Sequence, residues 1–346
     1  MTGRRSTLTS LIFAFAVLVT FSGVAGAQDG LRTAFGAPDL QGVWDFRTIT
    51  PLQRPEDLGE QAFLTEEEAS QREQGAVDRA IAAWDRDARR TEAGGNVGGY
   101  NNFWMDQGTN IVGTRRTSLI VAPSNGRIPE MTDAGQARRT RVGSFNVEVP
   151  ESYTELSNAD RCIMGFNAGP PITPGGYNQN MQLFQTPDHV VLVTEMVHTT
   201  RVIPIDGQPG LDDSVRQWSG DSRGHWEGDT LVIETTNFSP KFPYRGSGEN
   251  RKLVERYTRV DENTLEYEVT IEDPTVWAAP WTVRQELKRQ SDEENRIYYE
   301  PRCHEGNYGL PALLIGARVD EQEFEAGRGP DPFSMDTATC VNGLPE

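Results

Sequence analysis

The second half of the sequence is a long series of short segments with strand character, separated by turn residues. The segment 264–272 shows the pattern most clearly, because Leu265, Tyr267, Val269 and Ile271 alternate with polar residues. Alternation with a period of two is typical of a strand with one buried face in an antiparallel sheet. Few helical patterns follow residue 90. The sequence therefore predicts a mainly β fold, an antiparallel meander that closes into a barrel or packs as a sandwich.

Two further segments matter for the candidate site. The first is a predicted strand over 190–198, whose last residue is His198. If it is regular, His198 shares the inward face of that strand with Leu192 and Thr194. The second is 226–233, where Glu227-Gly228 is a candidate two-residue hairpin turn.

A helical arm is expected before the strands. Thr65 and Glu68 form a capping box, and mostly strong helix formers follow over 66–90. The segment 91–113 is rich in Gly and Asn and carries Phe103 and Trp104. Exposed aromatic residues in such a loop favour a lid or a ligand-stacking surface, although aromatic residues that tuck into the body would explain them equally well.

The N-terminus has the features of an export signal. Arg4 and Arg5 precede an apolar run over 11–21, and the small residues Ala25-Gly26-Ala27 provide a cleavage site. The sequence predicts a signal peptide over 1–27, a region over 28–113 with a leader strand, the helical arm and the Gly/Asn/aromatic loop, and a barrel-like domain over 114–346 that ends in an acidic tail. The expected location is secreted or periplasmic, by the general or the twin-arginine route.

Charge and cysteine content narrow the possible partners. The formal net charge is −18, which disfavours nucleic acid, because nucleic-acid binding needs a basic surface. Contact with a membrane after signal cleavage is also not expected. An exported chain permits one disulfide, and Cys162, Cys303 and Cys340 allow three pairings.

Candidate chemistry is concentrated in two polar, glycine-punctuated segments, 218–229 and 300–308, which we expect to be loops or strand ends at the barrel mouth. An imidazole there would act as acid or base, a carboxylate would orient it, and a guanidinium would hold a developing anion. The candidate catalytic residues are His304, His198, Glu305, Arg201 and Asp221, with Glu195 as a further carboxylate. The candidate ligand-binding residues are Trp218, Arg223, Tyr308, Phe103 and Trp104.

These residues also have structural interpretations. Asp221 and Arg223 could form surface ion pairs, and His198 could be a hydrogen-bonded core residue. No metal site is expected, because the chain has no HExxH or CxxC spacing. The G-x-S-x-G elbow of serine hydrolases and the glycine-rich loops that bind phosphate or dinucleotides are also missing, so no cofactor is expected.

The residues favour three functions, in descending order. The first is an exported enzyme that acts on a small hydrophobic or aromatic molecule by cofactor-independent acid–base chemistry, as a lyase, isomerase or hydrolase. The second is a non-catalytic barrel that binds such a ligand. The third is a glycan-processing or glycan-binding protein, which would need two suitably spaced carboxylates.

Two resemblances accompany this interpretation. Gly42-Val43-Trp44 at the start of the meander resembles the Gly-x-Trp strand of lipocalin-like barrels. The string from Trp226 to Phe238, WEGDTLVIETTNF, together with CHEGNY over 303–308, resembles a widespread family of exported, uncharacterised bacterial proteins. The second resemblance implies export and no particular activity.

Overall fold

The computed structural model describes residues 31–84, 105–142, 150–156, 158–291, 306 and 308–332. In these ranges the chain forms one antiparallel sheet that curves into a nearly closed barrel, which confirms the expected mainly β, barrel-like fold. The strands are β1 (Gly42–Asp45), β2 (Ile120–Ala122), β3 (Asn180–Gln185), β4 (His189–Thr194), β5 (Thr200–Pro204), β6 (Asp221–Glu227), β7 (Thr230–Thr236), β8 (Lys252–Asp261), β9 (Thr264–Glu272) and β10 (Trp281–Arg289). The α-helices are α1 (Glu66–Trp84), α2 (Asp133–Val142) and α3 (Gly309–Glu325).

Strand order in the barrel is β5-β4-β3-β1-β10-β9-β8-β7-β6, and β2 pairs with the first part of β10. The two outer strands, β5 and β6, lie against each other without ladder pairing in the described part of the chain. We call this line of contact the seam. Side chains close it: Arg201 of β5 donates a hydrogen bond to Ser222 of β6 at 2.9 Å. A Cβ atom on Gly224 of β6 would lie only 2.6 Å from Ile205, so the glycine permits this close approach.

Residue alternation explains why the interior is continuous. Strand β9 buries Leu265, Tyr267, Val269 and Ile271, as the sequence predicts. On the neighbouring β8, Tyr257 lies opposite Tyr267, with ring centroids 4.9 Å apart. The inward side chains of the other strands extend this cluster into a single core, and burial of apolar area of this kind is the main stabilising contribution to a fold.

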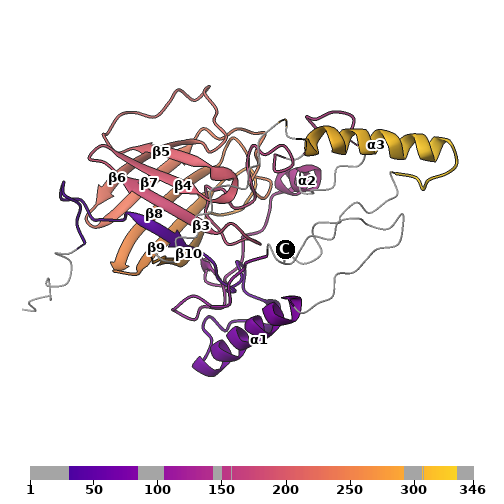
Figure 1. The fold of residues 1–346 in the computed structure, drawn as a ribbon. Coiled ribbons are helices and arrows are strands. Elements are labelled where there is room, and N and C mark those ends of the chain that lie inside the picture. Colours follow the sequence, from indigo (N-terminus) through magenta and orange to yellow (C-terminus); the bar gives the residue numbers. More distant parts are fainter. Residues whose placement is uncertain are drawn as a thin grey trace, which may run out of the picture.

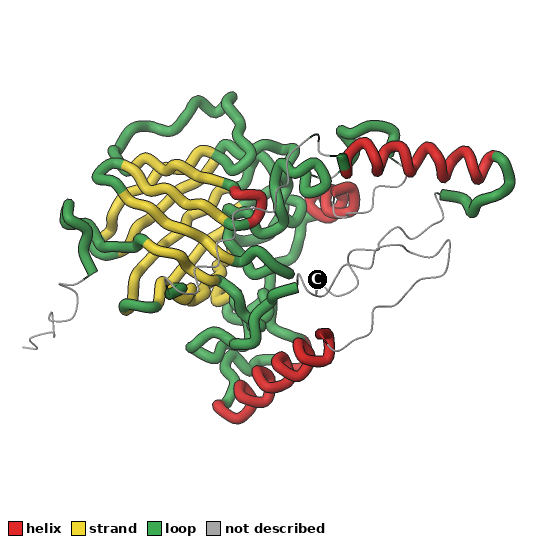
Figure 2. Tube along the Cα trace, in the orientation of Figure 1, coloured by secondary structure: helices red, strands yellow, loops and turns green. Residues whose placement is uncertain are grey.

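The helices and most of the long connections lie beyond one end of the barrel (Figures 1 and 2). This is the end at which β3, β5, β6 and β8 begin and β4, β7 and β9 finish, and we call it the loop-covered end. Helix α1 starts with the expected capping box: Glu68 N donates to Thr65 Oγ1 at 3.2 Å, and Thr65 N donates to Glu68 Oε2 at 2.8 Å.

Three details differ from the expectation. Strand β4 stops at Thr194, and residues 195–198 form a turn, because Thr194 N donates back to Thr199 O at 2.9 Å and reverses the chain. The hairpin turn between β6 and β7 is Gly228-Asp229, with Gly228 at a φ of 61°. Segment 221–227, expected to be loop or strand end, is the regular strand β6.

Candidate functional site

The structure separates the residues that the sequence suggested for the site. His304, Glu305, Phe103 and Trp104 lie outside the described residues. Of the remaining six, Arg201 is inside the barrel, and Asp221 and Arg223 pair with each other on β6. The other three lie in separate places. His198 is in the turn after β4, Trp218 just before β6 and Tyr308 just before α3.

Arg201 is enclosed in the barrel interior and bound to a buried carboxylate. Its Nη2 lies 2.6 Å from Glu255 Oε2 and its Nη1 lies 3.1 Å from Glu255 Oε1. Nη2 also donates to Ser222 and Thr235. Glu255 attracts the guanidinium and raises the pKa of Arg201 against the opposing effect of burial. In this geometry the partner of the guanidinium is Glu255 rather than a substrate anion.

Two tyrosines complete this interior cluster. Tyr257 Oη and Tyr267 Oη donate to Glu255 Oε1 at 3.2 and 3.0 Å. Burial and the neighbouring carboxylate raise the pKa of both phenols well above their usual value. Ile172 covers the cluster, because its N–H donates to Tyr267 Oη and its carbonyl accepts from Gln285. The centre of the barrel is thus filled by a polar network, in which Arg201 Nε and Gln285 Oε1 are the atoms without a partner among the described residues.

Asp221 and Arg223 form a contact of their own on the outer face of β6. Arg223 Nη2 lies 3.1 Å from Asp221 Oδ1, and Asp221 Oδ2 accepts from Leu211 N at 2.8 Å. Trp218 is exposed to about a third of its surface and Tyr308 is 95% exposed. These four residues do not form one site with Arg201.

A different carboxylate has the properties expected of an acid–base group. Glu195 follows β4 directly at the loop-covered end and is only 5% exposed. Its Oε2 accepts from Asn180 Nδ2 at 2.7 Å and from Asn180 N at 3.2 Å. Asn180 Oδ1 in turn accepts from Gln290. Burial raises the pKa of Glu195, although hydrogen bonds from Asn180 and Asn178 act in the opposite direction.

Glu195 opens a strained turn. Val197 has a φ of 55° and His198 a φ of 42°, so two consecutive residues other than glycine are in the left-handed region. That region is unfavourable for a β-branched residue such as Val197, and strain of this kind concentrates at functional sites. The turn exposes His198 to solvent. The expectation of an inward-facing His198 is therefore wrong, because it assumed a regular strand to residue 198.

An apolar cluster borders the same turn. It consists of the buried residues Met164, Ala168, Met196 and Val197, with Ile163, Phe166, Tyr177 and Phe242 packed against them. Phe166 and Tyr177 meet edge to face with ring centroids 5.2 Å apart. Methionine and aromatic side chains adapt well to small apolar molecules. We call Glu195, Asn180, His198 and this apolar cluster the Glu195 site.

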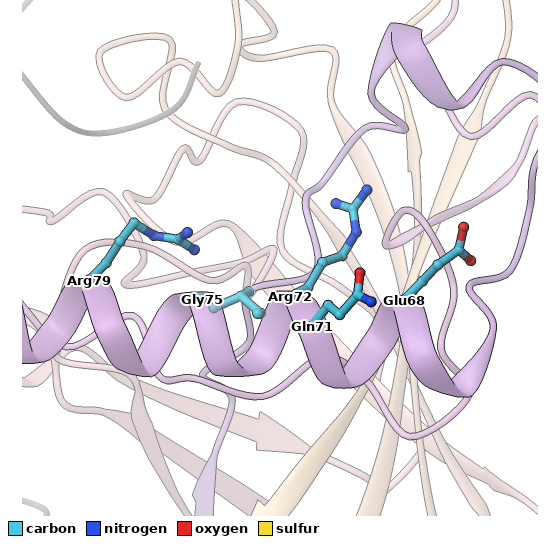
Figure 3. A pocket seen from close by; sticks show the side chains of 6 residues that line it. Glu68, Gln71, Arg72, Gly75 and Arg79 are labelled. Atoms are coloured by element: carbon cyan, nitrogen blue, oxygen red, sulfur yellow. The ribbon is translucent and has the colours of Figure 1, made fainter.

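The described residues also form a cavity of about 460 Å³ away from these groups, alongside helix α1. It is lined by Ile49 and by one face of the helix, from which Arg72 and Arg79 extend to the same side (Figure 3). Both arginines are exposed. None of the candidate catalytic or ligand-binding residues lines this cavity, and exposed guanidinium groups on a helix are common without a function.

Cys162 is disulfide-bonded, and the other two cysteines of the predicted pairings lie outside the described residues. In the part of the chain that the structure covers, no three acidic, histidine or cysteine side chains are grouped to hold a metal ion. No helix in that part is sufficiently long and apolar to span a membrane.

The sequence analysis named Glu195 only as a further carboxylate that could orient an imidazole, and it missed Asn180 and the turn. The signal for Glu195 was present, since a carboxylate stands among apolar residues near the end of a predicted strand. Comparison with known proteins adds no family: the sequence matches no protein-family model and none of the curated proteins. The resemblance to exported bacterial proteins therefore stays a prediction.

Proposed function

We propose that the protein is an exported enzyme that acts on a small hydrophobic or aromatic molecule by acid–base chemistry, with Glu195 as the proton-transferring group. The observation that carries the proposal is a buried carboxyl of raised pKa next to a strained turn and an apolar cluster. A raised pKa brings the protonation equilibrium of a carboxyl closer to neutral pH, where an acid–base catalyst is most effective.

Asn180 would orient the carboxyl. Its side-chain and backbone N–H groups both bind Oε2, which holds that oxygen in place. Because Asn180 Oδ1 is held by Gln290, the amide cannot rotate without breaking a second buried hydrogen bond. Holding a catalytic group in one orientation lowers the entropy that a reaction must lose.

The apolar cluster would supply the binding energy for the substrate. Phe166, Tyr177 and Phe242 are only partly buried, and we place the substrate against this side of the cluster. His198 is exposed three residues after Glu195, and we assign it the exchange of a proton with solvent or with a leaving group.

A ligand inside the barrel itself is less well supported. The centre is occupied by Arg201, Glu255, Tyr257 and Tyr267, and Ile172 covers them. Opening this interior would break a buried ion pair, which costs several kcal/mol. We therefore place substrate binding at the Glu195 site at the loop-covered end rather than in the barrel.

The test measures proton transfer directly, since the substrate is unidentified. The protein is incubated in D2O with a panel of small aromatic and terpenoid molecules, and mass spectrometry follows deuterium incorporation and loss of each compound. We expect at least one compound to react with the wild-type protein and to react at least a hundredfold more slowly with Glu195→Gln, within the range typical of a general acid–base group.

Glu234→Gln is the matched control, because Glu234 is an exposed carboxylate whose partner is the surface residue Lys252 at 3.2 Å. It should leave the rate unchanged. Equal rates for wild type and Glu195→Gln would refute the role of Glu195. A panel on which the wild-type protein transfers no proton would count against the proposed activity.

A further inference from the structure

Helix α3 exposes its apolar side chains. None of its residues is buried, and the helix extends away from the barrel (Figure 1). Leu313, Ile315, Val319 and Phe324 are exposed to between 44% and 63% of their surface. Most of the stability of a helix in a protein comes from the packing of its apolar face against another element. The exposed apolar surface of α3 therefore points to a partner.

One side of α3 carries a regular uncharged stripe, which we call the α3 seam. Its residues are spaced alternately four and three apart, and they are Tyr308, Ala312, Ile315, Val319, Gln322 and Ala326. All six are exposed. The first and last of them flank the helix and also have helical backbone angles, so the stripe continues through both ends. Leu310, Leu314 and Ala317, on another side of the helix, are partly buried.

The spacing of the α3 seam is that of a coiled coil. Steps of four and three average 3.5 residues, the period at which a seam faces a second helix along its whole length. A helix that packs on a globular body has a broader apolar face with a period of 3.6. At 1.5 Å per residue, the seam is about 27 Å long. Its shape therefore fits a second helix of similar length.

The charges beside the seam are complementary to those of a second α3. With Ala312 and Val319 at a positions of the heptad, Arg318 is at a g position and Glu323, five residues later, is at the following e position. In a parallel pair of helices, side chains at g and at the following e of the partner meet across the seam. Two copies of α3 would thus form two Arg318–Glu323 pairs between the chains.

Both charged residues have partners within their own chain. Arg318 lies 3.1 Å from Glu321 and donates to the carbonyl oxygen of Pro150 at 2.7 Å. Glu323 lies 2.7 Å from Arg328. The side chains in these ion pairs are 30–63% exposed, and exposed ion pairs contribute little to stability. Exchange of these partners across a seam is therefore inexpensive.

We propose that α3 pairs in parallel with α3 of a second copy of this chain and so forms a dimer. The parallel orientation places Gln322 against Gln322 of the second copy, and a polar residue matched with itself fixes the register of a coiled coil. An antiparallel pair would place Gln322 against Ala312 and bring the two Arg318 side chains together. An anionic lipid surface fits less well, because Asp320, Glu323 and Glu325 would repel it. The dimer does not depend on the chemistry proposed for Glu195.

Sedimentation equilibrium of the full chain tests the proposal. We expect a reversible equilibrium between monomer and dimer. Ile315→Glu/Val319→Glu places four charges in the paired seams and should raise the dissociation constant at least about a hundredfold, since loss of a single well-packed contact costs about tenfold. This variant should fold, because both side chains are exposed, and circular dichroism checks its helix content.

Leu313→Glu/Phe324→Glu is the matched control. It adds the same charges to the same helix at apolar positions that are 49% and 44% exposed and that lie away from the α3 seam, so it should keep the dimer. A wild-type protein that stays monomeric, a dimer that survives in Ile315→Glu/Val319→Glu, or a control that dissociates equally would each overturn the proposal.

Cysteine cross-linking tests the orientation. In a parallel pair, Gln322→Cys brings two thiols together, and mild oxidation should join the chains covalently. Asp320→Cys, away from the seam, and the wild-type protein should stay uncrosslinked under the same conditions. Failure of Gln322→Cys to cross-link in a preparation that sediments as a dimer would overturn the parallel pairing, as would equal cross-linking of Asp320→Cys.

Discussion

The interior cluster gives the sharpest stability prediction. Arg201→Met removes the cation and leaves the carboxylate of Glu255, which is 0% exposed, with only the two tyrosine hydroxyls as partners. Arg201 donates two charge-assisted hydrogen bonds to that carboxylate. Each such bond contributes about 1.5–3 kcal/mol. The two together are therefore consistent with the roughly 3–5 kcal/mol of unfolding free energy that is lost when one partner of a buried ion pair is removed. We expect Arg201→Met to lower the free energy of unfolding by about 4 kcal/mol.

Glu255→Gln tests the same reasoning from the other side. It leaves the guanidinium unpaired, and we expect a loss of roughly 3–5 kcal/mol. The double variant Arg201→Met/Glu255→Gln removes both charges, while the new side-chain amide oxygen keeps an acceptor for Tyr257 and Tyr267. It should be about 2 kcal/mol more stable than either single variant, because no charge remains buried without a partner.

Urea unfolding followed by tryptophan fluorescence and circular dichroism measures these free energies, with the m-value as a check that unfolding stays two-state. Arg223→Met is the control for loss of an arginine at a more exposed ion pair, and it should cost less than about 1 kcal/mol. Additive losses in the double variant, or a loss below about 1 kcal/mol for Arg201→Met, would refute the description of the cluster as a coupled buried ion pair.

Other elements of the fold give four smaller predictions. Burial raises the pKa of Glu195, so the folded state favours the protonated carboxyl. As the pH rises through that raised pKa, the free energy of unfolding of the wild-type protein should therefore fall relative to that of Glu195→Gln. Urea unfolding at several pH values measures the difference. Thr65→Ala removes the cap of α1 and should lower the free energy of unfolding by about 1 kcal/mol. Gly220→Ala should cost roughly 2–4 kcal/mol, because a Cβ atom there would lie 2.6 Å from Thr236 O at a φ of 73°. His198→Gly should relieve left-handed strain and raise the stability by up to about 1 kcal/mol, while slowing any reaction in the deuterium assay.

Local patterns were sufficient to predict much of the fold. The alternation over 264–272 predicts β9 and its buried face, and the Thr65–Glu68 box predicts where α1 begins. Local patterns did not decide between a barrel and a sandwich, because the pairing of β1 with β3 and β10 joins segments far apart in the sequence. No local pattern specifies such contacts.

The candidate site was harder to predict for the same reason. The polar segment 218–229 attracted attention through its composition, but most of it is the regular strand β6. Glu195 differs from other carboxylates because it is hydrogen-bonded to Asn180, fifteen residues earlier in the chain. Arg201 differs from other arginines because it is bound to Glu255, which lies on β8. A carboxylate or guanidinium acquires its properties from burial and from its partner, and both follow only from the tertiary structure.

The seam between β5 and β6 has a consequence for the motions of the barrel. Amide protons in the paired strands exchange with solvent only when a ladder opens, whereas those of β5 and β6 that face the seam depend on side-chain contacts for their protection. Hydrogen exchange should therefore be fastest along this line, and local opening should start there. Arg201 joins the two edges near the loop-covered end, where the Glu195 site lies, and Gly224 lets them approach closely, so we expect loss of the Arg201 contact to speed exchange along the seam.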